Sequence, residues 1–213
     1  MNKTQTNHIK LLSVIFCLCC LFSCSDNNPK LTQLSDYAVI LAFGDSLTYG
    51  TGADNSQTQS YPAVLQQLIG HSVINSGIPG EISMDGLVRL TEDLEEYEPD
   101  LVILCHGGND LIRRLNKDKL RHNLEQMVSL IQGSGAQVVL VGVPNFNITL
   151  AVPDLYVEIA QQFNVPIQMD VIPTVERNPS LKSDTIHPNT EGYKQVAQEI
   201  QQLLWETGAL LTN

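Results

Sequence analysis

Four short polar segments contain residue types that together could carry out nucleophilic catalysis. Ser46 stands in AFGDSLTYG, Gly80 in NSGIPG, Asn109 in HGGND, and Asp184 and His187 stand in DTIHPN. The serine is not in the G-x-S-x-G pattern of the α/β-hydrolase nucleophile elbow. Its neighbours must therefore decide whether Ser46 is a nucleophile or only a turn residue.

The serine, histidine and aspartate are the types that form a catalytic triad. A serine hydroxyl is a weak nucleophile, so a neighbouring base must take its proton during attack. Imidazole titrates near neutrality and suits this task, provided that Nε2 of His187 faces Ser46. Asp184 precedes the histidine by three residues, so its carboxylate could reach Nδ1 and stabilise the imidazolium. The order Ser…Asp…His is compatible with a triad, because a triad depends on geometry.

Each segment also has a simpler interpretation when taken alone. Asp45 and Ser46 could cap a helix. Gly107–Asp110 fits a turn, since glycine and asparagine tolerate positive φ. His187, before a proline, could be a loop histidine, and Gly80 could only end a loop. The presence of all four segments in one chain favours a shared site.

The elements that must position these segments alternate along the chain. Short apolar runs, rich in Val, Ile and Leu, predict buried strands at 37–43, 72–75, 100–105, 137–143 and 165–169. Apolar residues at helical spacing predict helices at 62–69, 83–97, 119–132, 154–163 and 189–205. This alternation predicts a three-layer α/β/α sandwich around a five-stranded parallel sheet.

The predicted strands give the polar segments a common location. In parallel α/β sheets, functional residues gather outside the carboxyl ends of the strands. Ser46, Gly80 and Asn109 each follow one of the first three predicted strands, and His187 precedes the last helix. We therefore expect the four segments to meet at one edge of the sheet.

The order and the residue types of these segments resemble the motifs of the GDSL (SGNH) hydrolase superfamily, from about Ala38 to Leu204. The matching motifs are G-D-S-L, N-x-x-x-x-G, G-G-N-D and D-x-x-H-P. The resemblance implies a flavodoxin-like sheet, a serine hydrolase that needs no cofactor, and a triad of Ser46, Asp184 and His187. It also implies an oxyanion hole formed by the backbone N–H groups of Ser46 and Gly80 and the side-chain amide of Asn109.

The resemblance is strongest to the bacterial thioesterase/arylesterase/lysophospholipase branch, through G-D-S-L-T-x-G-x-G, Ser60-Tyr61-Pro62 and I-H-P-N. That branch implies short- or medium-chain acyl esters, aryl esters, lysophospholipids or thioesters as substrates. Residues 144–153 look short for the branch, which would alter one wall of the pocket. Two alternatives remain open at this point: an O-acetyl esterase acting on cell-envelope carbohydrates, and a non-catalytic lipoprotein that binds a ligand.

Metal and phosphate chemistry are not supported by the sequence. Asp184, His187 and His106 could be imagined as metal ligands, but no H-E-x-x-H or H-x-H pattern is present. Neither a G-x-x-x-x-G-K-[ST] loop nor a dinucleotide fingerprint occurs. We therefore expect no metal site.

The pattern of the amino-terminal residues predicts a targeting segment. Lys3 and Lys10 flank the start of an apolar run, LLSVIFCLCCLF, which is too short to span a bilayer. The run ends in L-F-S-C, which resembles the lipobox of bacterial lipoproteins and implies cleavage before a lipid-modified Cys24. A cleaved, unlipidated secretory signal and an uncleaved anchor are the alternatives.

These features divide the chain into a signal peptide (1–23), a polar tether (24–36) and a hydrolase domain (37–213). In each of these cases the domain is expected outside the cytoplasm, and the lipobox resemblance implies a lipoprotein attached to a membrane.

Charge and cysteine content limit the partners and the means of stabilisation. Removal of the signal, which contains two lysines and no acids, changes the net charge from −11 to −13. Such an acidic chain, without a Lys/Arg cluster, excludes nucleic acid as a partner and repels anionic substrates at long range. Cys105 would be the only thiol left besides Cys24. We expect a hydrophobic core, and no internal disulfide, to stabilise the domain.

Overall fold

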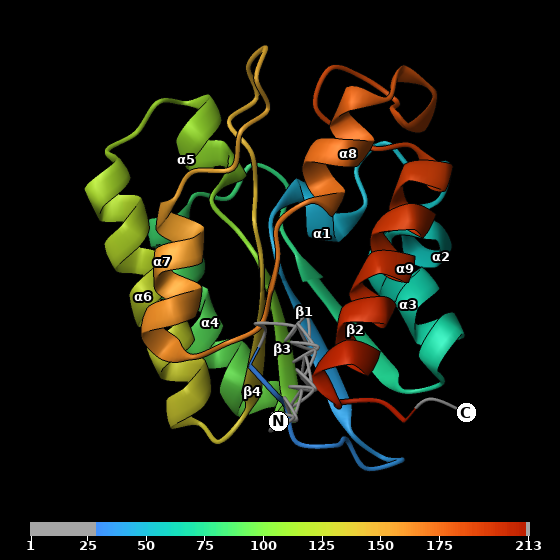
Figure 1. Ribbon diagram of the computed structural model, residues 1–213, viewed down its shortest axis with the longest axis vertical. Helices are drawn as coiled ribbons and strands as arrows, with labels where there is room; N and C mark the ends of the chain where they lie inside the picture. Colours follow the sequence, from blue (N-terminus) through green and yellow to red (C-terminus); the bar gives the residue numbers. More distant parts are fainter. Residues whose placement is uncertain (1–28, 212–213) are drawn as a thin grey trace, which may run out of the picture.

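Five parallel strands form one sheet in the computed structural model, which describes residues 29–211 (Figure 1). Their order across the sheet is β2-β1-β3-β4-β5, the flavodoxin-like arrangement. The strands are β1 (Val39–Gly44), β2 (Ser72–Gly77), β3 (Leu101–Cys105), β4 (Gln137–Val141) and β5 (Ile167–Gln168). The α/β sandwich expected from the sequence is confirmed.

The bounds of the first and last strands differ from those of the apolar runs that predict them. β1 begins two residues late, because Tyr37 points into solvent with 93% of its surface exposed. β5 keeps only two of the five residues predicted at 165–169. It is an edge strand, and Pro166 lacks the N–H that would extend its ladder.

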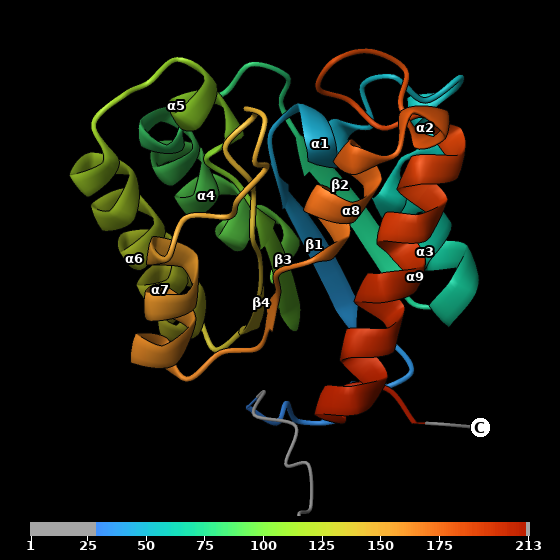
Figure 2. The same cartoon turned by 45° about the horizontal axis from the view of Figure 1, so that its top comes forward.

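Two layers of helices cover the faces of the sheet (Figures 1 and 2). α3 (Tyr61–Ile69) and α9 (Thr190–Thr207) pack together on one face. α4 (Ser83–Tyr97), α6 (Lys117–Gly133) and α7 (Leu155–Phe163) form the layer on the other face. These five helices are the ones predicted, with ends shifted by at most two residues.

Several short helices were not predicted. They are α1 (Ser46–Tyr49), α2 (Ser56–Gln59), α5 (Gly108–Ile112), α8 (Val171–Arg177) and the 3₁₀ helix η1 (Pro179–Leu181). α8 buries Val171, Ile172 and Val175 and tolerates Pro173 because this residue lies in its first turn. Within residues 29–211, no helix combines the length and apolar character needed to cross a bilayer.

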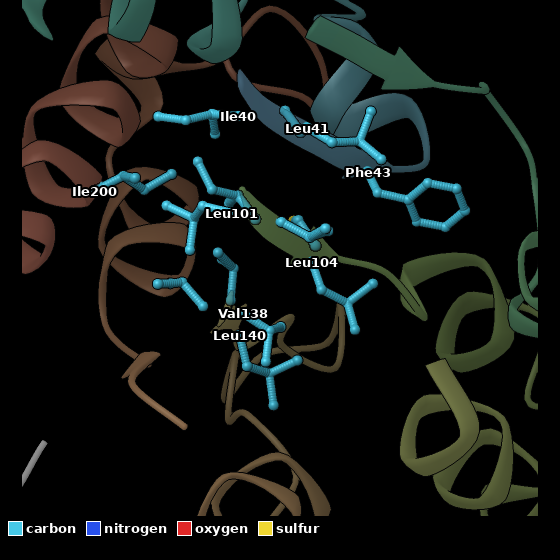
Figure 3. Close-up of a cluster of buried hydrophobic side chains, with 14 of the residues drawn as sticks. Ile40, Leu41, Phe43, Leu101, Leu104, Val138, Leu140 and Ile200 are labelled. Carbon is cyan, nitrogen blue, oxygen red and sulfur yellow. The ribbon is translucent and has the colours of Figure 1, made fainter. Parts of the chain in front are cut away.

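The core consists of the apolar strand residues and the helix faces that cover them. In Figure 3, Ile40 of β1 lies toward Ile200 of α9, whereas Phe43 points to the opposite side. Successive side chains of a strand alternate between faces, so β1 contributes to both halves of the core. The thiol of Cys105 is free and buried, and burial raises its pKa. It therefore acts as a packing residue.

Part of the expected tether packs against the base of the sheet. The N–H groups of Leu31 and Leu34 donate to the carbonyls of Thr207 and Ala209, at 2.8 and 2.9 Å. Leu34 is buried in the core. The chain is thus attached to the end of α9 from Leu31 onward, and Cys24 lies outside the described residues.

Candidate active site

The four polar segments lie at one edge of the sheet. Ser46, Gly80 and Asn109 follow β1, β2 and β3, and the loop between η1 and α9 carries Asp184 and His187. α1 and α5 mark this edge in Figure 2. β1 and β3 are neighbours here, at the point where the strand order reverses, which is the usual ligand site of this architecture.

A tight strand-to-helix turn presents Ser46. Asp45 caps α1, with Oδ1 accepting a hydrogen bond from the N–H of Leu47 at 3.1 Å. A Cβ on Gly44 would lie 2.1 Å from the carbonyl oxygen of Cys105, so only glycine fits between β1 and β3 here. Asp45 is buried, and desolvation raises its pKa. The turn therefore fixes Ser46 at the first position of α1.

Ser46, His187 and Asp184 form a continuous hydrogen-bonded chain. Nε2 of His187 lies 3.1 Å from Oγ of Ser46, and Nδ1 lies 2.8 Å from Oδ2 of Asp184. Oδ1 of Asp184 accepts from the N–H groups of Ile186 and His187, at 2.7 and 2.8 Å. Desolvation raises the pKa of Asp184, but the hydrogen bonds from His187 and the backbone outweigh it and lower the pKa. The carboxylate is therefore ionised next to the imidazole.

An ion pair supports the loop that carries this histidine. Nζ of Lys182 lies 2.7 Å from Oε2 of Glu176 on α8 and donates to the carbonyl of Thr185 at 3.0 Å. Ser183 and His187 are joined by a backbone hydrogen bond of 3.0 Å. The unpredicted α8 therefore helps to set the position of His187.

Within residues 29–211, two backbone N–H groups at this edge make no hydrogen bond, whereas the side-chain amide of Asn109 makes two. Among the described residues, the N–H groups of Ser46 and Gly80 donate to no other group. Gly80 has a φ of 82°, in the left-handed region. Nδ2 of Asn109 donates to the carbonyl of Glu81 at 3.0 Å and, less closely, to Oδ2 of Asp45 at 3.3 Å.

A charged cluster, partly to fully buried and indicated by no sequence motif, underlies this region. It consists of Glu81, Arg89, Asp93 and His106. The sequence suggests for His106 only an imaginable metal site with Asp184 and His187; the structure places it instead against Glu81, with none of its surface exposed. Arg89 and Asp93 follow Gly86 at helical spacing on α4, which was the available signal.

A cleft of about 500 Å³ adjoins the site. It is lined by Leu111, Ile112, Arg114, Leu115, Lys117, Asn145, Phe146, Asn147, Thr185 and Ile186. The last two stand between Asp184 and His187, so the cleft opens beside the histidine. Asn145, Phe146 and Asn147, from the segment 144–153, form part of one wall. Clefts at the base of the sheet, such as that lined by Trp205, contain none of the candidate residues.

No group of three metal-ligating side chains comes together in the part of the chain that the structure describes. The acidic and imidazole groups of the site are instead paired with one another or with Arg89 and Lys182.

Residues 42–195 match the GDSL-like lipase/acylhydrolase family. The chain belongs to this family. It is 31% identical to an arylesterase of Vibrio mimicus over 207 residues, which cover 92% of this chain and 98% of that protein. It is 28% identical to thioesterase 1/protease 1/lysophospholipase L1 of Escherichia coli K12 over 166 residues, or 74% and 79% of the two chains.

Solved structures agree with this membership. The psychrotrophic esterase EstA from Pseudoalteromonas sp., in a crystal structure inhibited by monoethylphosphonate, superimposes with a TM-score of 0.71. The match has 25% sequence identity and covers 79% of this chain and 97% of that one. As a member of the family with such relatives, the chain is an ester-hydrolysing enzyme.

Proposed function

We propose that the protein is a serine esterase in which Ser46 is the nucleophile, His187 the general base and acid, and Asp184 the residue that orients the histidine. The observation that carries this proposal is the chain of hydrogen bonds from Ser46 through His187 to Asp184, at 3.1 and 2.8 Å. These distances suit proton transfer and orientation of the imidazole.

The reaction has two halves. Oγ of Ser46 attacks the ester carbonyl while its proton passes to Nε2 of His187, which then protonates the leaving alcohol. This leaves an acyl group on Ser46. His187 next takes a proton from water while the water oxygen attacks the acyl carbonyl; the bond from this carbonyl carbon to Oγ of Ser46 then breaks, His187 returns the proton to Oγ, and the acid is released. Asp184 stays ionised throughout and stabilises the imidazolium.

The oxyanion of each tetrahedral intermediate requires donors that are fixed beforehand. The unpaired N–H groups of Ser46 and Gly80 are available for it. The third donor is Nδ2 of Asn109, whose bond to Asp45 is long at 3.3 Å and can be exchanged for one to the oxyanion. Its shorter bond to the carbonyl of Glu81 keeps the amide in place during this exchange.

The cleft beside His187 supports a proposal for the substrate class. Its lining is mixed: Leu111, Ile112, Leu115, Phe146 and Ile186 offer apolar contacts to a short or medium acyl chain or an aryl group, and the remaining half of the lining is polar or charged. The names of the relatives, arylesterase and thioesterase/lysophospholipase, favour the same range. We further propose that Cys24 carries lipid and that the enzyme lies outside the cytoplasm, from the L-F-S-C sequence that ends the apolar run.

The first experiment replaces the nucleophile. Ser46→Ala should lower the hydrolysis of a p-nitrophenyl ester by at least about 10⁴-fold and abolish labelling by a fluorophosphonate probe, with an unchanged circular dichroism spectrum. Ser134→Ala, an exposed serine at the end of α6, is the matched control and should keep full activity. Hydrolysis retained by Ser46→Ala would contradict the proposal.

A panel of esters then separates the substrate classes. Acyl chain length, aryl esters, a lysophospholipid, an acyl thioester and an O-acetylated sugar should be compared by kcat/KM. Preference for the O-acetylated sugar would favour the envelope-carbohydrate alternative. A protein that binds these compounds without hydrolysis or probe labelling would be a binding lipoprotein.

A further inference from the structure

The loop that carries Gly80 is held by a carboxylate that the proposed reaction does not use. The side chain of Glu81 is 6% exposed and accepts from Nε and Nη2 of Arg89, at 2.8 and 2.7 Å. It also accepts from Nε2 of His106 at 3.1 Å. A guanidinium that engages both oxygens of a carboxylate fixes its orientation as well as its position. Glu81 is therefore held from two sides.

The backbone of Glu81 connects two of the proposed oxyanion donors. Glu81 directly follows Gly80, and its carbonyl accepts the hydrogen bond from Nδ2 of Asn109 at 3.0 Å. Its N–H donates to the carbonyl of Ile78 at 3.2 Å and closes the turn in which Gly80 lies. Movement of Glu81 would therefore displace the Gly80 N–H and the Asn109 amide together.

Arg89 connects this loop to the strands of the sheet. The guanidinium lies 4.1 Å from the ring centroid of Phe43. Nη2 donates to the carbonyls of Gly44 and Ser76, at 3.4 and 3.3 Å. These two residues stand at the carboxyl ends of β1 and β2. Arg89 thus joins Glu81 to the strand that leads to the nucleophile.

His106 joins the same carboxylate to the end of β3. The N–H of Gly107 donates to Nδ1 of His106 at 2.8 Å, so the ring proton lies on Nε2 and is donated to Glu81. A Cβ on Gly86 would lie 2.4 Å from Nε2, so α4 leaves room for the ring only because it has glycine there. His106 thereby ties Glu81 to the start of α5, which carries Asn109.

We propose that Glu81 is a positioning residue for the oxyanion hole, whose carboxylate, held by Arg89 and His106, sets the spacing between the Gly80 N–H and the Asn109 amide. The inference rests on the proposed function of these two donors. Glu81 touches neither Ser46 nor His187 and acts only through its neighbours. Because oxyanion donors act on the transition state, loss of their spacing lowers kcat and leaves KM nearly unchanged.

The test is Glu81→Gln, which keeps the size of the side chain but places an NH₂ group where only acceptors fit. We expect kcat for a p-nitrophenyl ester to fall about 10- to 100-fold and KM to stay within about threefold. Rates are divided by the concentration of active serine, titrated with a phosphonate, so that misfolded protein does not contribute. Glu81→Asp, which keeps the charge, should have an intermediate kcat.

The matched control is Glu158→Gln, which removes a carboxylate from the surface ion pair with Arg121 and should leave kcat within about twofold. A folded Glu81→Gln with wild-type kcat, or with an effect confined to KM, would overturn the inference. If Glu81→Gln does not fold, Arg89→Lys is the second variant, because lysine cannot make the bidentate contact with Glu81. It should show the same fall in kcat, and a wild-type kcat in Arg89→Lys would overturn the inference. Absence of phosphonate labelling at Ser46 in the wild type would instead contradict the proposed function.

Discussion

Asp184 is half exposed, with 50% of its side-chain surface accessible, although it orients the histidine that faces Ser46. A carboxylate in this setting shares its task with water, so its replacement costs less than in a buried triad. We predict that Asp184→Asn lowers kcat by about 10³-fold, against about 10⁴-fold for a buried triad aspartate. Asp154→Asn, an exposed aspartate before α7, is the control and should have wild-type kcat.

The lowered pKa of Asp184 adds a second measurable consequence. The carboxylate ionises below its ordinary value of 3.8 and stays charged throughout the range in which esterases are assayed. The acid limb of the kcat/KM profile should therefore not arise from Asp184, and Asp184→Asn should lower the profile without removing this limb. Loss of the limb in the variant would show that Asp184 itself titrates there.

At the scale of single residues, the sequence could locate the polar segments but not the contacts among them. Ser46, Gly80 and Asn109 could be located because each stands in a polar motif after a predicted strand, and Asp184 and His187 because they stand in a motif before the last helix. Their catalytic roles stay predictions until the variants are measured. The contact of Glu81 with Arg89 and His106 joins a loop, a helix and the end of a strand. No local pattern reports such a contact, because each residue alone is an ordinary charged or polar residue.

At the scale of elements, apolar runs and helical spacing predicted the sheet and the five long helices, since burial imposes both patterns. The elements that were not predicted, or were predicted with other bounds, have physical reasons. α8 is short and contains Pro173, so its apolar residues did not read as helical. β5 lies at the edge of the sheet, where pairing on one side shortened it. α8 matters for the site, because it supplies the carboxylate that pairs with Lys182.

The Glu81 carboxylate, which is paired with Arg89 of α4 and with His106 after β3, predicts that the stability of the fold depends on pH. Desolvation raises the pKa of Glu81, but hydrogen bonds from Arg89 and His106 outweigh it and lower the pKa from 4.5 to about 2. Asp93, the other charged group of this cluster, pairs with Arg89. Because the folded pKa is the lower one, the carboxylate stabilises the fold above about pH 4.5, and this contribution is lost as the pH falls toward 2.

Glu81→Gln should therefore be less stable than the wild type at neutral pH, by about 3 kcal/mol in the free energy of unfolding. The difference should shrink steadily when the pH is lowered from 4.5 toward the folded pKa of about 2. Urea denaturation at a series of pH values measures it. A difference that stays constant with pH would show that the ionised form of Glu81 contributes nothing.

At the scale of the whole molecule, the candidate site and the start of the described chain lie at opposite ends of the sheet. The site lies at the carboxyl ends of the strands, and the first described residues lie at the opposite end, next to the end of α9 (Figures 1 and 2). β1 alone separates the two ends by about 17 Å, from the rise per residue of an extended strand. Leu31 and Leu34 are hydrogen-bonded to the base, so the chain leaves the domain there.

This attachment predicts how a lipid-anchored form reaches its substrates. From Cys24 to Leu31 the chain spans at most about 25 Å when fully extended. In vesicles, the lipidated enzyme should hydrolyse a soluble p-nitrophenyl ester at the rate of the unlipidated domain, but an ester embedded in the same bilayer much more slowly. Insertion of a long flexible linker after Cys24 should raise only the second rate. Equal rates on both esters without the linker would contradict this prediction.

The hydrogen bonds of Leu31 and Leu34 therefore do more than close the base of the sheet. They hold the first described residues at the end of the sheet opposite the site, so a lipid on Cys24, as proposed, would be attached on the side of the domain away from Ser46. Such an attachment would favour esters dissolved in the aqueous phase, or belonging to a facing layer of the envelope, over esters of the bilayer that carries the lipid.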